Sequence, residues 1–245
     1  MKNGKRSTTN PDLMTFLTSN KILTIDELID FIDQYKWPTV SRKKIKYYNV
    51  PVAFDIETSS FRINGEKCAI MYEWTFSFFG AVVIGRTWDE FLNMLDRICD
   101  KLNTSPDQRI VLYIHNLSFE FAFMRKFFEW HDVFAIDTYK PIRACTDRGV
   151  EFRCSYVLSG YSLATVAKNL TEVKISKLKG ELNYDLIRTP LTPLTDREIQ
   201  YCINDVQIVV AYIQERIIFD GNIAKIPHTK TGYVRQYCRK MCFYG

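Results

Sequence analysis

Two acids, Asp55 and Glu57, lie close together at the end of an apolar run that begins at Pro51. On a β-strand, side chains at positions i and i+2 point to the same face of the sheet. Two carboxylates on one buried face repel each other, and this repulsion raises the pKa of at least one of them. A divalent cation bound between them removes that cost. The pair therefore indicates a metal site, and its alternative is an ordinary acidic pair at an exposed strand end.

A second candidate region is the junction between a predicted strand and a predicted helix. The strand ends in His115 and Asn116, and Glu120 falls in the first turn of the helix that follows. Ligand sites in α/β proteins are common at such junctions. The alternative role for Glu120 is to stabilise the helix N-terminus through the helix dipole. We expect His115 to be buried and hydrogen-bonded, not to be a metal ligand.

A third candidate region is Tyr201-x-x-x-Asp205 in a predicted long helix. Residues at i and i+4 lie on the same helix face, so the phenol and the carboxylate can project into one pocket. The alternative is a partly exposed helix face with no chemical role.

Taken together, the three regions supply four carboxylates, from Asp55, Glu57, Glu120 and Asp205, with Tyr201 beside the last. Four carboxylates suit two divalent cations about 3.5–4 Å apart. One cation would make hydroxide available near neutral pH, and the other would stabilise the leaving oxygen, while Tyr201 oriented the attacking water. Hard oxygen ligands favour Mg²⁺ or Mn²⁺ over zinc. The chemistry indicated is hydrolysis of a phosphodiester.

The elements that must position these residues follow from hydrophobic periodicity and from capping signals. Capping boxes at Thr24, Thr87 and Thr195 open three predicted helices. These cover residues 25–36, 88–102 and 196–219, and shorter helices are predicted over residues 118–130 and 162–169. Strands are predicted over residues 51–57, 68–79, 81–86, 109–115, 133–136, 142–146 and 150–157. Strands come first and then alternate with helices, which favours an α/β fold with helices packed on a mixed β-sheet.

Composition narrows the class of protein. The chain has 245 residues, of which 47% are hydrophobic and 14% aromatic, so it can bury a sizeable core and is not of disordered composition. Its seven cysteines are scattered, mostly in apolar runs, which favours reduced thiols over a disulfide framework. No apolar run approaches the roughly 20 residues of a membrane span, and no secretory signal is present, so we expect no membrane association.

The formal net charge is +5, and basic residues at 42–46 and 225–240 flank the acidic strand. This distribution suits a polyanionic substrate, although solvated surface lysines explain it equally well. Cys238 and Cys242 with His228 form at most half of a zinc site, because a convincing fourth ligand is absent from the sequence around them.

At this point the chain resembles a known family. Phe54-Asp-Ile-Glu-Thr58, Tyr113-Ile-His-Asn-Leu-Ser-Phe119 and Tyr201-x-x-x-Asp205 are similar to the three motifs of DEDDy 3′→5′ exonucleases. The resemblance is strongest to the proofreading exonuclease domain of protein-primed family B DNA polymerases of phages, adenoviruses and linear plasmids. It covers about residues 50–220 and implies an RNase H-like mixed sheet flanked by helices.

The resemblance also implies roles for individual residues. Asp55, Glu57 and Asp205 would hold one metal, and Asp55 with Glu120 would position the second. Lys179 would act at the scissile phosphate. The single-stranded DNA 3′ end would be held by Thr58, Tyr113, His115, Asn116, Phe119, Leu163 and Tyr184. Aromatic rings among these can stack on unpaired bases, worth roughly 1–3 kcal/mol per base, although Tyr113 could equally be a core residue.

From this resemblance we divide the chain into three parts: a small N-terminal helical extension (residues 1–48, the first 12 a polar lead), an exonuclease domain (residues 49–222) and a basic tail (residues 223–245). The tail resembles the lead-in to a polymerase domain, but we find no polymerase palm motif. Expected partners are such a polymerase domain and a priming terminal protein. The expected location is the cytoplasm, that of the host if the gene is a phage gene.

Two alternatives to a proofreading exonuclease stay open. Glu120 stands where the family has Asp, which changes the reach of this carboxylate by one methylene and puts the metal spacing and the rate in question. One alternative is a catalytically weak module that binds DNA or docks a polymerase. The other is a free-standing nuclease that trims RNA, which the 2′-hydroxyl would distinguish.

Overall fold

The computed structural model describes residues 11–19, 21–178 and 186–242. Within these residues, nine strands form one mixed sheet in the order β5-β4-β3-β6-β9-β8-β7, and the β1–β2 hairpin joins it through β2 and β6. The strands are β1 Thr39–Arg42, β2 Ile45–Tyr48, β3 Val52–Ile63, β4 Glu66–Phe78, β5 Ala81–Gly85, β6 Gln108–Ile114, β7 Trp130–Asp137, β8 Lys140–Thr146 and β9 Val150–Cys154. The predicted mixed sheet with flanking helices is confirmed.

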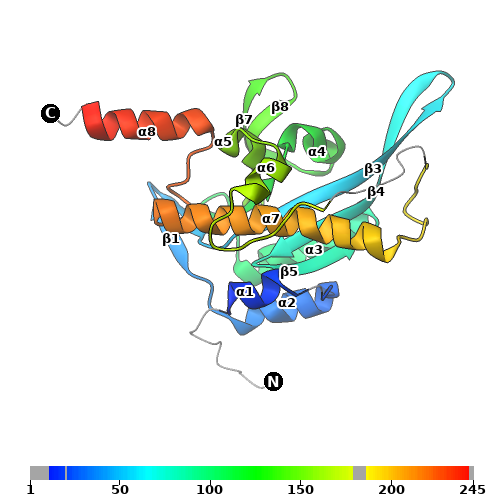
Figure 1. Cartoon of the computed structure of the whole chain (residues 1–245), viewed down its shortest axis with the longest axis horizontal. Coiled ribbons are helices and arrows are strands. Elements are labelled where there is room, and N and C mark those ends of the chain that lie inside the picture. The colour runs from blue at the N-terminus through cyan, green and yellow to red at the C-terminus, as the bar shows by residue number, and fades with distance from the viewer. Residues whose placement is uncertain (1–10, 20, 179–185, 243–245) are drawn as a thin grey trace.

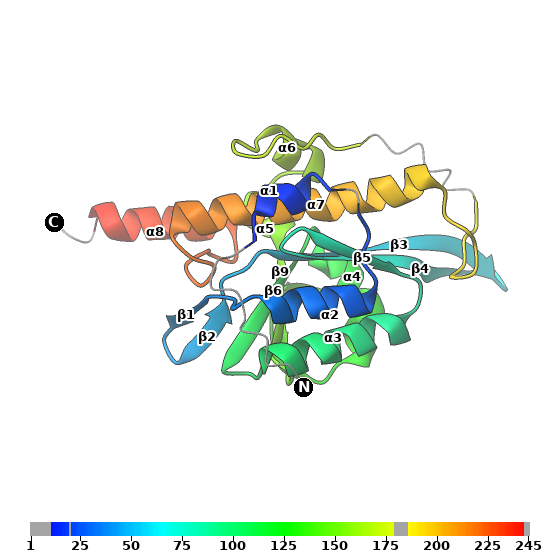
Figure 2. The ribbon, with the colours of Figure 1, turned by 90° about the horizontal axis from the view of Figure 1, so that it is seen from below.

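Helices cover both faces of the sheet. They are α1 Leu13–Leu17, α2 Ile25–Gln34, α3 Trp88–Leu102, α4 Leu117–Met124 with a 3₁₀ turn η1 Arg125–Phe127, α5 Ser155–Ser159, α6 Leu163–Lys168, α7 Asp196–Asp220 and α8 Lys230–Cys242. Figure 2 shows α7 on one side of the sheet, with α2 and α3 on the other. Each face has its own apolar core, one built on α2, α3 and α4 and the other on α6 and α7.

The three predicted capping boxes are present at the starts of α2, α3 and α7. In each, a threonine hydroxyl accepts a hydrogen bond from the N3 backbone amide, and the N3 glutamate accepts one from the threonine amide. A reciprocal cap of this kind satisfies two of the four backbone donors that a helix start leaves unpaired. The helix starts were therefore predictable from local sequence.

Several boundaries differ from the predictions. Residues 39–48 of the expected helical extension form the β1–β2 hairpin, because β2 pairs with β6 of the main sheet. The helix predicted over residues 118–130 ends at Met124, since Trp130 begins the β7 edge strand. The strand predicted to reach residue 157 ends at Cys154, where α5 begins. The predicted polar lead falls mostly outside the described residues.

The basic tail contains a helix that the sequence analysis did not predict. Helix α8 has no buried residue and extends away from the body of the molecule (Figure 1). No helix among the described residues is long and apolar enough to span a membrane.

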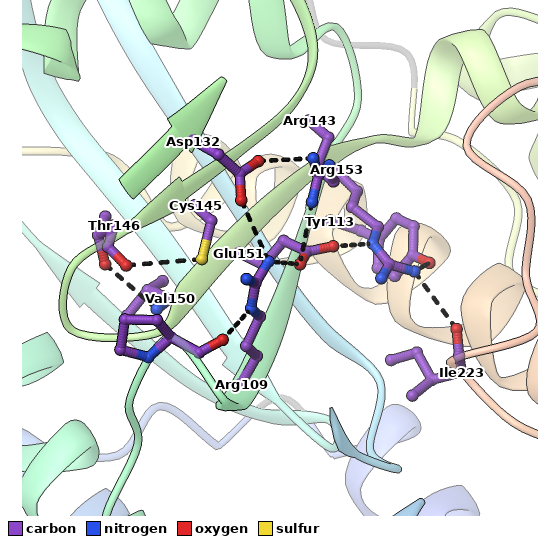
Figure 3. Close-up of polar contacts among 11 residues, drawn as sticks. Arg109, Tyr113, Asp132, Arg143, Cys145, Thr146, Val150, Glu151, Arg153 and Ile223 are labelled. Atoms are coloured by element: carbon purple, nitrogen blue, oxygen red, sulfur yellow. Dashed lines mark hydrogen bonds and ion pairs between the residues drawn. The ribbon is translucent and has the colours of Figure 1, made fainter. Parts of the chain in front are cut away.

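A buried ion network joins strands β6 to β9 (Figure 3). Glu151 is fully buried and accepts hydrogen bonds from Arg109 Nη1 and Arg153 Nε, each at 2.7 Å. Arg143 and Asp132 extend the network towards the sheet edge. Arg153 also donates to the Tyr113 hydroxyl and to the carbonyl of Ile223, so the network ties the sheet to the segment after α7.

Candidate active site

The site begins where the parallel pairing of two neighbouring strands, β3 and β6, ends. β3 and β6 pair in parallel, with Ala53 opposite Tyr113, so Asp55 and His115 both follow this pair at the same edge of the sheet. A register shift after Glu57 marks a β-bulge in the β3–β4 ladder. Bulges re-aim side chains and are frequent beside active sites.

Two helices bring the other predicted acids to this edge. Glu120, in the first turn of α4, is 3% exposed, and Asp205, in the middle of α7, is 6% exposed. Asp55, His115 and Asp205 line a cavity of about 170 Å³, together with Leu163 at the start of α6. Side chains from β3, α6, α7 and the residue that follows β6 therefore meet in one small pocket, although Asp55 and Asp205 are 150 positions apart in the sequence.

The four carboxylates perturb one another. Burial raises the pKa of Asp55 well above its usual range, and the charges of Glu57 and Asp205 raise it further. Burial, with the charges of Glu73 and Asp205, raises the pKa of Glu57 to about 8. Burial and the charge of Asp55 likewise raise the pKa of Glu120 well above its ordinary value. Clusters of buried acids with raised pKa values are typical of functional sites.

Lys177 lies at the centre of the site, although the sequence analysis did not select it. Its ammonium donates hydrogen bonds to Asp205 Oδ2 and, at 3.1 Å, to the hydroxyl of Tyr201. The side chain of Asn204 fixes this segment, because it donates to the carbonyl of Ser176 and accepts from the amide of Leu178. Asn204 stands directly before Asp205, but no local sequence signal shows that it anchors a loop from about 30 residues away.

Glu73 is a fifth carboxylate that the sequence analysis missed. It is 1% exposed, lies opposite Glu57 in the β3–β4 ladder and accepts a hydrogen bond from the Thr75 hydroxyl. Burial raises its pKa to about 8, and the charge of Asp55 adds to the effect. The turn at Asn64-Gly65 joins β3 to β4 and pairs Ile63 with Glu66, but the β-bulge after Glu57 then shifts the register by one residue, and this shift places Glu73 opposite Glu57.

The donor set fits hard divalent cations. One buried oxygen each of Glu120 (Oε2) and Asp205 (Oδ1) accepts no hydrogen bond from the described part of the chain. Such oxygens are costly to bury unless a cation or a donor reaches them. Nevertheless, no three His, Cys, Asp or Glu side chains among the described residues form a ready-made metal cluster. The ammonium of Lys177 pairs with one oxygen of Asp205.

The residues predicted to hold the DNA end or to act at the scissile phosphate, apart from Tyr113, divide into three groups. His115 and Leu163 line the pocket, and Phe119 is 42% exposed beside it, with Asn116 exposed at the start of α4. Thr58 is half-buried directly after the β-bulge. Lys179 and Tyr184 lie outside the described residues.

The zinc alternative is not supported, because Cys238, Cys242 and His228 do not form a group of three possible ligands in the part of the chain that the structure describes.

Tyr113 is a correction. It is 1% exposed, packs in the α7-side core, and its hydroxyl accepts a hydrogen bond from Arg153 Nη1 at 3.3 Å. A ring buried on this scale presents no face to a base, so Tyr113 is a core residue and not a DNA contact. His115, by contrast, behaves as expected: its Nδ1 lies 3.0 Å from Ser155 Oγ, and burial lowers its pKa to about 4.

Comparisons with known proteins agree with this arrangement. The family model of the 3′-5′ exonuclease matches residues 22–217. An orthorhombic crystal form of Phi29 DNA polymerase is similar with a TM-score of 0.59 and 17% identity, over 79% of this chain and 34% of that one. Phi29 DNA polymerase complexed with single-stranded DNA gives a TM-score of 0.55 and 17% identity, over 71% and 32% of the two chains. No curated protein matches the sequence.

The chain spans about a third of the length of these solved polymerases. At such low identity the likeness shows the fold, which is the predicted RNase H-like one. The family match, over residues 22–217, confirms the resemblance to a 3′-5′ exonuclease domain.

Proposed function

This chain belongs to the 3′-5′ exonuclease family, and we propose that it hydrolyses single-stranded DNA from the 3′ end with two divalent cations, Mg²⁺ or Mn²⁺. The observation that carries the proposal is the meeting of four acids from three elements, Asp55, Glu57, Glu120 and Asp205, close enough to shift one another's pKa. Mutual repulsion of buried carboxylates destabilises the fold, so their collection at one edge points to a cation-dependent role.

Each residue of the site has a role that its position supports. Asp55 with Glu57 and Asp205 would hold one cation, and Asp55 with Glu120 the other. When bound, such cations lower the pKa of a water and stabilise the charge on the leaving oxygen. The Tyr201 hydroxyl lies beside Asp205 and already takes part in a hydrogen bond with Lys177, so it is placed to orient the attacking water.

The DNA end would be held by apolar and neutral polar groups around the pocket. The exposed ring of Phe119 can stack on an unpaired base. His115 is uncharged at neutral pH because its pKa is about 4, so it can make a hydrogen bond to the strand without adding charge. Leu163 supplies an apolar wall to the cavity. Contacts of this kind read the shape and the backbone of a strand and not its base sequence.

We further propose that this activity is the proofreading module of a protein-primed family B DNA polymerase. The support is the fold shared with Phi29 DNA polymerase, one structure of which is complexed with single-stranded DNA. The corresponding partners would be a polymerase domain and a priming terminal protein, and the location would be the cytoplasm of a host cell.

The test is a cleavage assay on a 5′-labelled single-stranded DNA oligonucleotide, with Mg²⁺, Mn²⁺ or EDTA. We expect a cation-dependent ladder that shortens from the 3′ end and disappears in Asp55→Ala. The matched control is Asp196→Ala, an exposed acid on α7, which should cleave like the unmodified protein. Equal cleavage by Asp55→Ala would rule out the proposed site.

One observation favours a second candidate, a module that binds DNA with little or no cleavage. Lys177 occupies an oxygen of Asp205, and the described residues hold no ready-made metal cluster. Binding of the oligonucleotide without cleavage at any cation concentration would select this candidate. An RNA oligonucleotide of the same sequence, run in parallel, separates a DNA nuclease from one that trims RNA.

A further inference from the structure

A second and larger cavity lies beside the site, and the proposed chemistry does not use it. It has a volume of about 720 Å³ and is bounded by β4, the start of α3, the end of α4 with η1, and the loop at Pro190. Ligand pockets are usually about 300–1,000 Å³, so this one is large enough for a nucleotide.

The cavity and the carboxylate site share no lining residue, but two elements connect them, the β3–β4 pair and α4. Met71 in its wall pairs with Thr58, the residue that follows Glu57. On α4, Phe123 in the wall comes three residues after Glu120, and its ring lies 5.3 Å from the exposed ring of Phe119. Three residues of an α-helix advance by about 4.5 Å along its axis, so the wall of the cavity at Phe123 lies about that far along α4 from Glu120.

One wall of the cavity is fixed by hydrogen bonds from the half-buried side chain of Arg86. Arg86 donates a hydrogen bond from Nε to the carbonyl of Tyr72 at 2.7 Å. Its Nη2 donates to the carbonyls of Thr189 and Thr192 at 3.1 and 2.6 Å. These contacts hold the loop that carries Pro190 against β4, so the cavity does not depend on a ligand for its shape.

The lining combines positive charge with aromatic rings. The charged residues that line it are Arg86, Arg125, Lys126 and Asp89, so the net charge of the lining is +2. Arg125 and Lys126 are exposed, and Lys126 Nζ lies 4.9 Å from the centre of the Phe127 ring. Trp88 packs against Phe127 with ring centres 5.1 Å apart. Cations beside aromatic rings are the combination that binds the phosphates and bases of single strands.

We propose that this cavity is a second single-strand subsite, which holds nucleotides on the 5′ side of the end bound at the carboxylates. The inference rests on the proposed exonuclease function, because it places the strand's 3′ end at Asp55 and Glu120. A strand entering over Phe119 and Phe123 would bring its backbone to Arg125 and Lys126. The subsite would make binding depend on the length of the oligonucleotide.

The experiment measures fluorescence anisotropy with labelled single-stranded DNA of 3 and of 12 nucleotides, using the full chain in EDTA so that binding is read without cleavage. We expect Lys126→Glu to raise the Kd of the 12-mer about tenfold, and to lower the slope of log Kd against log salt by at least about 0.7, the share of one single-strand phosphate. Lys126→Arg keeps the positive charge, so its Kd for the 12-mer should equal that of the unmodified protein. Lys126→Glu should change the Kd of the 3-mer by less than twofold.

The matched control is Lys36→Glu, at another exposed lysine, which follows α2 and does not line the cavity. It should leave the Kd of the 12-mer unchanged. Equal weakening by both charge reversals, or none by Lys126→Glu, would overturn the subsite. Cleavage by the unmodified protein with Mg²⁺ is measured separately, so loss of the proposed function is distinguished from loss of the subsite.

Discussion

Glu57 on β3 and Glu73 on β4 are direct cross-strand partners, so a fifth buried carboxylate stands beside the four that the motifs supply. Both have a pKa of about 8, chiefly because they are buried. Replacing Glu73 with glutamine keeps its shape and its acceptor for the Thr75 hydroxyl but removes its charge. We expect Glu73→Gln to stabilise the protein by about 2 kcal/mol at pH 8, roughly 4–8 °C in Tm, and by much less at pH 4.5. Thermal unfolding at the two pH values checks this. An equal gain at both would exclude a charge effect.

The pH dependence of stability should change when a cation is added. Because the pKa values of Glu57 and Glu73 are raised in the folded state, that state binds more protons than the unfolded chain between about pH 4.5 and 8. Stability without metal should therefore fall as pH rises through this range. Mn²⁺ at about 100 times its Kd should raise stability by about 2.7 kcal/mol at pH 8, with a smaller gain at pH 5.5, where protons compete. Differential scanning calorimetry with Mn²⁺ or EDTA measures both, and Asp55→Asn should lose most of the cation response.

The position of Lys177 predicts competition with metal. Its ammonium binds an oxygen of Asp205, so a cation at that oxygen must displace it. We expect Lys177→Met to lower the Mn²⁺ concentration that half-saturates the site by about tenfold, because like charges a few ångströms apart repel by more than 1 kcal/mol. Isothermal titration with Mn²⁺ gives the value. Lys174→Met, an exposed lysine in the same loop, is the control, and an equal change in both variants would contradict the competition.

Replacing Glu120 with the shorter aspartate should lower the rate of cleavage. Glu120 is buried, and the charge of Asp55 helps to raise its pKa, so its carboxylate lies beside Asp55 at the reach of a glutamate. Glu120→Asp withdraws that carboxylate by one methylene, and displacements of about 1 Å can cost roughly 100-fold in rate. We expect kcat/KM on single-stranded DNA to fall by about 10- to 100-fold with folding intact. Full activity of Glu120→Asp would contradict this prediction, because it would mean that an aspartate at this position reaches the metal as well as a glutamate does.

The Glu151 network predicts loss of stability in acid. Arg153 and Arg109 hold the pKa of Glu151 at about 2, although burial alone would raise it. A folded pKa below the unfolded value of about 4.3 gives stability that is present above that value and is lost as pH falls towards 2. Glu151→Gln would leave buried arginines unpaired and should destabilise the protein by about 3 kcal/mol at pH 7. Urea unfolding measures the loss, which should shrink below pH 4.

The sequence alone predicted those features of the site and the fold that depend on short stretches of the chain. Spacings of two on a strand and of four on a helix are geometric, so Asp55 with Glu57 and Tyr201 with Asp205 followed from the order of residues alone. The capping boxes fixed the starts of α2, α3 and α7 for the same reason, because a cap involves only four consecutive residues. The carboxylates of the site and the class of fold were therefore within reach of the sequence.

What only the tertiary structure decided depends on contacts between distant segments. Asn204 anchors the loop that puts Lys177 on Asp205, and strand register puts Glu73 opposite Glu57. Tyr113 lies in the core and not at the substrate because it precedes His115 by two residues on the α7 side of the sheet, where its ring is packed in the α7-side core and its hydroxyl accepts a hydrogen bond from Arg153. Each of these follows from the register or the packing of two elements. The spacing of residues within one element does not determine how that element pairs or packs with another.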